Sequence, residues 1–398
     1  MLSSIFAIGI LIITIIGFYY IMRLKNVHIW FLSYLKHQLR LMFNKKNKFP
    51  IHIIFCFVDH FEPKWEKPSK DIENARVEAW LQKYPVITNS HMDSDGKRPQ
   101  HTWFYPAEEY EYEHLEKLAW LCQMGYGEIE LHLHHDNDTP EGVRNKINDG
   151  IINYTKHGAF GFENEAGKIR YGFIHGNWAL NNSDARGINC GVNDEITILL
   201  ETGCYADFTL PAAPSSCQTR KINSIYYAFD NPLKPKSHNT GVDVEVGRKQ
   251  SSGLMIIQGP LTLDWKRRKY GIIPRIENGE ISGRNPGTPE RVDNWVRQNI
   301  RVVGKEDWVF LKVHCHGAQE RDWDALLGNN CHRLFEYLET KYNDGKSYKL
   351  HYVTARECYN IVKAAEAGEI GNPNMFRDYL IKRQSCEDIR TVKTFEAK

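Results

Sequence analysis

Histidine and carboxylate side chains gather at several points of this chain, each at the end of a short apolar run. The densest group lies in residues 128–138, where His132 and His134 are two positions apart. On an extended strand this spacing places both imidazoles on one face, which suits them to bind one divalent metal ion. His135 or Asp136, where the chain turns, would add a further ligand. The pattern therefore predicts a metal site.

Two other groups could move protons beside such a metal. Asp59 and His60 follow an apolar run, and Glu62 comes two positions later. A carboxylate there could hold a water molecule and accept its proton, although Asp59 could instead cap the next helix. His314 and His316 share a face at the end of another run, and either could protonate a leaving group.

Aromatic and polar side chains near these groups suggest a carbohydrate substrate. In the segment His-Gly-Asn-Trp at residues 175–178, Trp178 would stack on a sugar ring. His175 and Asn177 would bond the sugar hydroxyls. Trp103 and Asp207 are further candidates for substrate contact.

The elements that must position these residues form an α/β pattern. Each polar group ends an apolar run of strand length, and barrels and open α/β sheets place their active sites at such carboxyl ends. Thr354-Ala-Arg-Glu is a capping box that opens the last helix. Residues 181–301 contain many Gly and Pro residues and predict long loops with an antiparallel insertion. The predicted strands are 51–58, 102–105, 129–134, 171–175, 309–314 and 350–353, and the predicted helices are 72–82, 112–124, 331–342 and 358–367.

The order of these motifs resembles the polysaccharide deacetylase family. Residues 102–105, the helix after them and Gly-Tyr-Gly-Glu-Ile-Glu-Leu-His, ending at His132, are similar to the second and third strands of that family. Asp59 resembles its aspartate motif. Residues 309–314 resemble its late strand ending in the catalytic-acid His, and residues 350–357 its last strand and helix.

The resemblance implies an irregular (β/α) barrel with one divalent metal held by Asp and two His, an Asp base and a His acid. His132 would be the first His ligand and His314 the acid. The second His of the family falls on Asp136, so His134, His135 or Asp136 must take that role. The mixed nitrogen and oxygen ligands favour Zn and also permit Mn, Ni or Co.

The Asp-Asp pair of the family aligns in two ways. If it corresponds to Val58-Asp59, Asp59 is a metal ligand and Glu62 substitutes for the base. If it corresponds to Asp59-His60, Asp59 is the base and His60 is a ligand, which we favour. His175-Gly-Asn-Trp replaces the Arg-x-Pro motif of the family.

The predicted activity is removal of N- or O-acetyl groups from a polysaccharide or lipid-linked glycan. A glycoside hydrolase on the same barrel would instead pair Asp207 with Asp59 or Glu62. A metallo-β-lactamase-like hydrolase would use His132-x-His134-x-Asp136, but Asn137 stands where its next His belongs. A non-catalytic glycan-binding or assembly subunit is the remaining alternative.

The N-terminal segment predicts a single-pass membrane protein. Residues 5–22 are apolar, carry no charge and are about long enough to cross ~30 Å of hydrocarbon. An uncleaved anchor is favoured over a signal peptide, because no positive charge precedes the stretch and no small-x-small site follows. Seven Lys and Arg residues within 23–50 place the C-terminal domain on the cytoplasmic side. Residues 30–43 would lie on lipid or pack on the domain.

The expected organisation is an anchor and basic segment over 1–50, a barrel domain over 51–385 and a tail over 386–398. The expected partners are a lipid bilayer and a carbohydrate or lipid-linked glycan, and no protein partner is indicated. Beyond residue 50 the chain has 44 basic and 49 acidic residues, which gives nucleic-acid binding little support. Nine cysteines without a CxxC pair exclude a disulfide scaffold and favour a reducing compartment.

Overall fold

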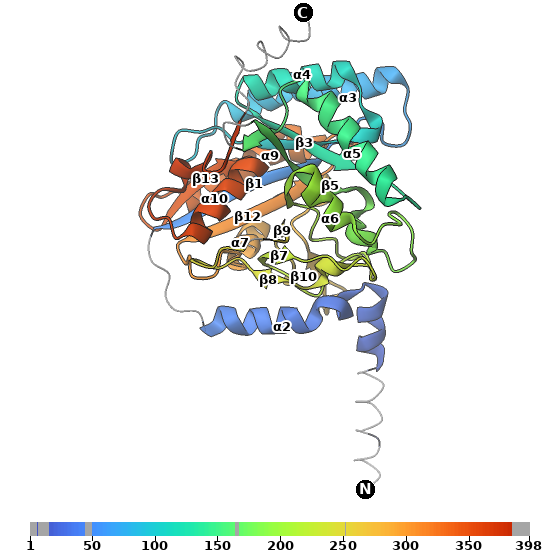
Figure 1. The fold of residues 1–398 in the computed structure, drawn as a ribbon. Coiled ribbons are helices and arrows are strands. Elements are labelled where there is room, and N and C mark those ends of the chain that lie inside the picture. The colour runs from blue at the N-terminus through green and yellow to red at the C-terminus, as the bar shows by residue number, and fades with distance from the viewer. Residues whose placement is uncertain (1–5, 7–15, 44–49, 164–166, 251, 384–398) are drawn as a thin grey trace, which may run out of the picture.

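A largely parallel sheet of twelve strands organises the domain in the computed structural model, which describes residues 6, 16–43, 50–163, 167–250 and 252–383 (Figure 1). Its main path runs β12-β1-β2-β3-β5-β6-β9-β7-β8, with β13 beside β1, β4 beside β5 and β14 beside β4. The strands are β1 Ile51–His60, β2 His101–Pro106, β3 Gly127–Leu133, β4 Gly161–Glu163, β5 Lys168–His175, β6 Cys204–Asp207, β7 Ile225–Ala228, β8 Val242–Asp243, β9 Leu254–Ile257, β12 Trp308–Cys315, β13 Tyr348–Val353 and β14 Ile381–Arg383.

The predicted α/β class and parallel sheet are confirmed. All six strands expected from the apolar runs are present, and β1 pairs in parallel with β12, β13 and β2. Strands β2, β3 and β5 continue the parallel order. The strand pairings of the described residues form an open path and do not include one that closes a barrel.

Both faces of the sheet are buried, as is expected of parallel strands. Along β1, Phe55 and Phe57 belong to one apolar cluster, which the helices α3, α4, α5 and α9 complete. Cys56 and Val58 belong to a second cluster, to which α10 contributes Ile361. The helices are α2 Val27–Phe43, α3 Lys70–Thr88, α4 Tyr112–Gln123, α5 Pro140–Thr155, α6 Glu195–Thr202, α7 Pro289–Arg297, α8 Trp323–Leu327, α9 Asn329–Tyr342 and α10 Ala355–Ala367.

Local sequence signals account for several boundaries. The Thr354 hydroxyl oxygen accepts the backbone N–H of Glu357, and the Glu357 carboxylate accepts the backbone N–H of Thr354. The predicted capping box therefore begins α10. Gly368, with φ 85°, ends the same helix. The segment 181–301 contains the predicted antiparallel pairs, β7 with β8 and β9, and the separate hairpin of β10 Thr262–Lys269 and β11 Ile273–Glu277.

The predicted membrane location is contradicted. The described part of the chain contains no helix with both the length and the apolar character needed to cross a bilayer. Most of the expected span, residues 5–22, lies outside the described residues, as does the predicted tail over 386–398. The single-pass topology and the side assigned to the domain are therefore withdrawn.

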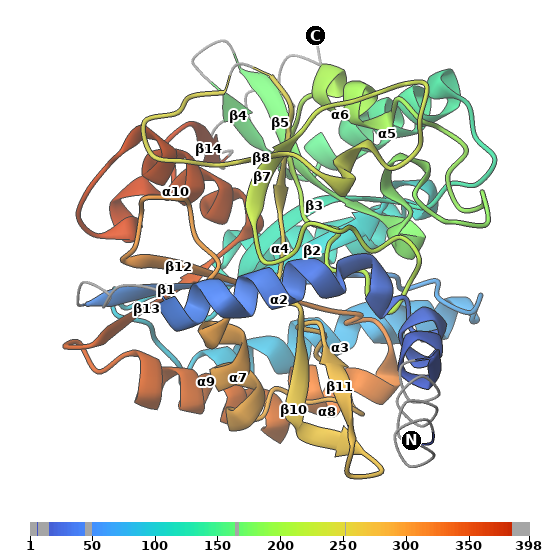
Figure 2. The same ribbon diagram turned by 90° about the horizontal axis from the view of Figure 1, so that it is seen from below.

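Helix α2 packs on the domain, which was one of the two alternatives for residues 30–43. Figure 2 shows it crossing the face that carries the β10–β11 hairpin. Its Trp30 is fully buried and belongs to an apolar cluster with Leu261 and Leu263. Tyr34 accepts a hydrogen bond from Trp265 of the hairpin at 3.1 Å. The helix therefore supports β10 directly.

Removing the Trp30 side chain should destabilise the protein through this contact. Trp→Ala changes in a packed core cost about 3–5 kcal/mol, because apolar burial is lost and a cavity remains. We expect Trp30→Ala to lower the free energy of unfolding in urea by that amount. Leu32→Ala, on the exposed side of the same helix, should change it by less than about 0.5 kcal/mol. Equal effects would show that α2 is not docked as described.

Candidate metal centre and cavity

Two strand ends bring His60, Glu62 and His132 together. His60 ends β1 and His132 lies near the end of β3, while Glu62 follows β1 directly. One ligand atom from each residue lies within 4.8 Å of the other two. His132 Nε2 is 3.2 Å from Glu62 Oε1, and the rings of His60 and His132 are 5.0 Å apart. This buried group could hold a metal ion.

The hydrogen bonds of His132 leave a lone pair facing a carboxylate. Its Nδ1 lies 2.9 Å from the carbonyl oxygen of Ile174, which can only accept, so we assign the ring proton to Nδ1. In the neutral ring, Nε2 is then an acceptor, and it faces the acceptor Glu62 Oε1. Burial lowers the pKa of His132, which favours that neutral ring. A cation between the two atoms would satisfy both.

His60 is also held in the form that binds metals. Burial lowers its pKa well below the ordinary value, and the nearby rings of His316 and His132 act in the same direction. Burial opposes the ionisation of Glu62, but the hydrogen bond from His134 favours the carboxylate, and the pKa of Glu62 is well below its ordinary value. The cluster thus presents two neutral imidazoles and one carboxylate.

His134 lies between two carboxylates. Its Nδ1 is 2.6 Å from Glu108 Oε1, and its Nε2 is 3.0 Å from Glu62 Oε1. Burial opposes protonation, but the two hydrogen bonds outweigh it and raise the pKa of His134 to about 10. In the metal-free protein His134 is therefore an imidazolium that fixes Glu62, rather than a free ligand.

The cluster borders a cavity of about 820 Å³. Trp65 and Trp178 line it with Asn177, and the hairpin β10–β11 supplies much of the opposite wall. Its border is predominantly cationic. Six basic side chains line it, Lys25, Arg267, Lys269, Arg275, Arg284 and Arg321, against three carboxylates, Glu62, Glu280 and Asp322.

Of the two histidines predicted as acids at the end of β12, His316 lines the cavity and His314 does not. The ring of His316 lies 4.9 Å from that of His60. His314 is 4% exposed, and burial lowers its pKa well below the ordinary value. Backbone pairing of His314 with Gly279 and Ile281 brings Glu280 to the cavity.

A second buried cluster joins His135, His175, Cys190 and Glu195. Their ligand atoms also lie within 4.8 Å of one another. His135 Nε2 is 3.0 Å and His175 Nε2 is 3.5 Å from Glu195 Oε1, while Cys190 Sγ is 3.6 Å from Glu195 Oε2. His175 does not line the cavity of about 820 Å³, contrary to the prediction.

Asp59 and Trp103 also depart from their predicted roles. Asp59 Oδ2 lies 2.9 Å from His101 Nε2, and Oδ1 accepts the N–H of Gly317 at 2.6 Å. Both oxygens are engaged on the face opposite His60, because successive residues of a strand point to opposite faces. Trp103 is fully buried against Trp80 on that same face. Neither residue reaches the cavity.

Asp136 and Asp207 are likewise misplaced for the roles expected of them. Asp136 is exposed and accepts the backbone N–H of Asn189 at 2.5 Å, which takes it away from His132. Asp207 is fully buried and bonded to Thr209, and burial raises its pKa to about 7. It does not line the cavity.

Sequence reasoning missed Glu108, Cys190, Glu195 and the cations of the hairpin. Glu108 directly follows β2, so its place at a carboxyl strand end was a usable signal. Cys190 and Glu195 lie in and after an irregular loop, where no spacing rule relates them to His135. The run Lys-Arg-Arg-Lys at 266–269 was visible in the sequence, but its position required the fold.

Comparisons with known proteins give little guidance. No family model matches the chain, and no curated protein matches it. Among solved structures, it is similar to the 4-alpha-glucanotransferase from Thermococcus litoralis, with 11% sequence identity and a TM-score of 0.36. The match covers 77% of this chain and 43% of that enzyme, so the chain spans less than half of its length. A likeness this weak assigns neither family nor function.

The ion pairs of His134 predict a pH-dependent contribution to stability. Its folded-state pKa of about 10 exceeds the ordinary value of about 6.5, so the contribution is complete below about pH 6.5 and is lost as the pH rises through about 10. We expect the loss of unfolding free energy in His134→Gln to be largest near pH 6 and to shrink towards pH 10, measured in urea with a chelator present.

Asp136→Asn is the matched control from the same loop. It should show no trend between pH 6 and pH 10. A His134→Gln effect that stays constant over this range would contradict the proposed charge state of His134.

Proposed function

We propose that the chain is a metal-dependent hydrolase that removes acetyl groups from an acidic carbohydrate. His60, His132 and Glu62 would hold one divalent ion, with zinc favoured by two imidazoles and one carboxylate. The observation that carries the proposal is the 3.2 Å approach of two acceptors, His132 Nε2 and Glu62 Oε1, beside a cavity of about 820 Å³. That approach is close to the spacing of about 3.3 Å between neighbouring ligand atoms in a tetrahedral site.

A bound divalent ion would polarise the acetyl carbonyl and acidify a water molecule. The water adds to the carbonyl carbon, the bond from that carbon to the sugar nitrogen or oxygen breaks, and acetate leaves. His316 borders both the cavity and His60, so it can accept the proton of the water and return it to the departing atom. His134 holds Glu62 against His132 throughout.

The shape and charge of the cavity support a carbohydrate substrate with negative charge. Trp178 lines the cavity and can stack on a sugar ring, while the ring of Trp65 lies under the guanidinium of Arg321 at 4.9 Å. Of the six cations on its border, Arg267 is paired with Asp264 and Glu277, and the other five favour uronate, sulfate or phosphate groups on the glycan. The substrate would be a polysaccharide or a lipid-linked glycan that carries such groups.

A glycoside hydrolase would need Asp207 to face Asp59 or Glu62 across the cavity. Asp59 and Asp207 are both fully buried and hydrogen-bonded away from the cavity, so neither faces Glu62 across it. The non-catalytic glycan-binding alternative differs from our proposal in bound metal and in acetate release, which the following experiments measure.

Loss of His132 should remove both the ion and the activity. We expect His132→Ala to contain one divalent ion fewer per chain by elemental analysis and to release no acetate from an acetylated acidic glycan. Asp136→Ala, which alters the same polar segment outside the cluster, should retain both. His316→Ala should keep the ion and lose about 10²–10⁴ in rate.

Unchanged metal content in His132→Ala would overturn the assignment of the ligands. A wild-type protein that holds the ion and binds the glycan but releases no acetate would support the glycan-binding alternative.

The cationic border should affect substrate binding rather than the chemical step. Exposed ion pairs contribute about 0.2–1 kcal/mol each, so Arg275→Ala combined with Arg284→Ala should raise KM for an acidic glycan roughly 2- to 30-fold. We expect kcat to be unchanged and the effect to fade at high salt. Arg268→Ala, exposed on the same hairpin but outside the cavity, is the control. An equal effect on a neutral acetylated glycan would argue against charge recognition.

A further inference from the structure

The cluster of His135, His175, Cys190 and Glu195 lies apart from the cavity and takes no part in the proposed reaction. All four residues are buried, and they come from three different places in the fold. His135 follows β3 and His175 ends β5, while Cys190 lies in the loop that leads to Glu195 at the start of α6. Four side chains with metal-binding atoms thus meet in the interior.

We propose that these four residues form a structural zinc site, separate from the metal centre of the cavity. Two imidazoles, a thiolate and a carboxylate are a donor set that tetrahedral zinc accepts. The two anionic ligands, Cys190 and Glu195, would balance the 2+ charge of the ion, so the complete site buries no net charge.

The contacts of the two Glu195 oxygens with the other three residues have lengths close to those between neighbouring ligand atoms of a tetrahedral ion. Zinc-to-nitrogen and zinc-to-sulfur bond lengths place neighbouring ligand atoms about 3.3–3.6 Å apart. The Glu195 carboxylate lies 3.0 Å from His135, 3.5 Å from His175 and 3.6 Å from Cys190. Small side-chain adjustments would bring all four atoms onto one ion.

An unsatisfied nitrogen points into the cluster. His175 is fully buried, and its Nδ1 is hydrogen-bonded to the carbonyl oxygen of Gly176, which assigns the ring proton to Nδ1. Nε2 then carries a lone pair towards Glu195 and has no hydrogen-bond partner among the residues that the structure describes. A buried acceptor that faces a carboxylate requires a cation or a proton donor.

The surroundings orient the other ligands in the way that metal sites require. Cys190 Sγ accepts the backbone N–H of Asn182 at 3.2 Å, a contact that stabilises a thiolate. Glu195 Oε2 accepts the backbone N–H of Asn181 at 2.5 Å. The loop backbone therefore fixes two ligands, and an ion would in turn fix the loop.

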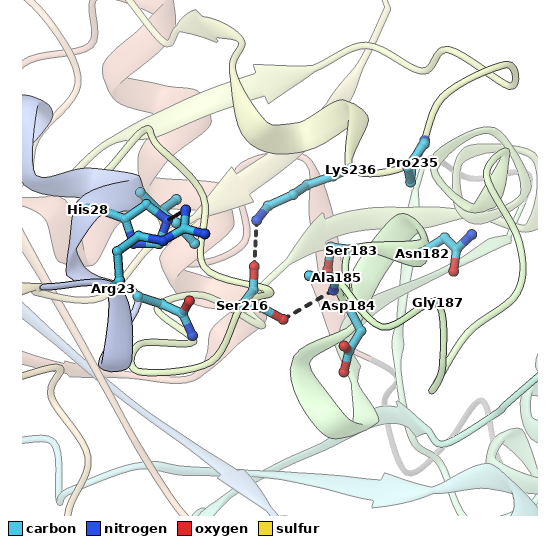
Figure 3. A pocket seen from close by; sticks show the side chains of 12 residues that line it. Arg23, His28, Asn182, Ser183, Asp184, Ala185, Gly187, Ser216, Pro235 and Lys236 are labelled. Atoms are coloured by element: carbon cyan, nitrogen blue, oxygen red, sulfur yellow. Dashed lines mark hydrogen bonds between the residues drawn. The ribbon is translucent and has the colours of Figure 1, made fainter. Parts of the chain in front are cut away.

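A zinc ion at this site would fix the loop of residues 176–195 to the ends of β3 and β5. This loop has little regular structure, and it carries Asn177 and Trp178 at the substrate cavity. Figure 3 shows the part of this loop around residues 182–187, where the backbone N–H of Ala185 donates to Ser216 Oγ at 3.1 Å. Five of its non-glycine residues have positive φ, namely Asn177, Trp178, Asn181, Asn182 and Asn189. Such a backbone benefits from ligands that tie it to β3 and β5.

Metal analysis of full-length variants tests the site independently of the cavity. We expect the double variant His60→Ala/His132→Ala to retain one zinc per chain, and the addition of Cys190→Ala to remove it. Cys204→Ala, a buried cysteine outside the cluster, is the matched control and should retain zinc. A double variant without zinc, or a Cys190→Ala variant with the zinc content of its parent, would overturn the proposal.

Cobalt substitution provides a second measurement that does not depend on a folded Cys190 variant. With Co²⁺ in the double variant, a thiolate-to-cobalt charge-transfer absorption should appear, because the site contains a sulfur ligand. Cys315→Ala should leave this absorption in place, since Cys315 belongs to a different buried group with Asp59 and His101. Its disappearance in that variant, or its absence in the parent, would refute the assignment.

Glu195→Gln keeps the size of the side chain and removes its charge. We expect at least a tenfold loss of zinc affinity in competition with a chelator, and faster hydrogen exchange over residues 176–195. Unchanged affinity would contradict a role for Glu195 as ligand.

Discussion

Strand β1 is hydrogen-bonded on both edges and buried on both faces, and its register decides which of its residues face the cavity. It pairs with β12 on one side and with β13 and β2 on the other. Adjacent residues must project to opposite faces, and a shift by one position would exchange them. Asp59 therefore contacts His101 under the helices, while His60 faces the cavity. His134 and His135, just after β3, likewise belong to different polar clusters.

The sequence contained enough local information to predict six of the twelve strands of the sheet and four of the helices that flank it. Apolar runs marked the strands, and the capping box at Thr354 marked the last helix. The sequence also predicted that His60 and His132 lie at the carboxyl ends of strands. The assignment of faces failed for Asp59 and Trp103, because a strand buried on both sides has no alternation of apolar and polar residues to show which face is which.

The parts that could not be predicted depend on contacts between distant residues. Glu195 meets His135 across 60 positions, and the hairpin of residues 262–277 reaches the cavity only through the folding of the middle segment. The apolar pattern of residues 30–43 suited either a lipid surface or a helix packed on the domain. Only the fold shows that Trp30 and Tyr34 are covered by the domain.

Both polar clusters are governed by the cost of burying a carboxylate beside an imidazole. At Glu62 the surroundings include His134 and the partly exposed Glu108, so charge can be redistributed as ligands arrive. At Glu195 the contacts are backbone N–H groups and fully enclosed rings, which allow little change. The surroundings of Glu62 can therefore adapt to a change in charge, whereas those of Glu195 are fixed.

Helix α2 and the residues just before it contact the wall of the cavity that the β10–β11 hairpin forms. Lys25, just before α2, lines the cavity, and Asn26 binds the carbonyl oxygen of Pro214 on the same wall at 3.0 Å. Trp265 connects the hairpin to Tyr34. The first helix thus acts as a brace for a binding wall that the rest of the chain builds. Substitutions in α2 would therefore act on the cavity indirectly, through the position of the β10–β11 hairpin.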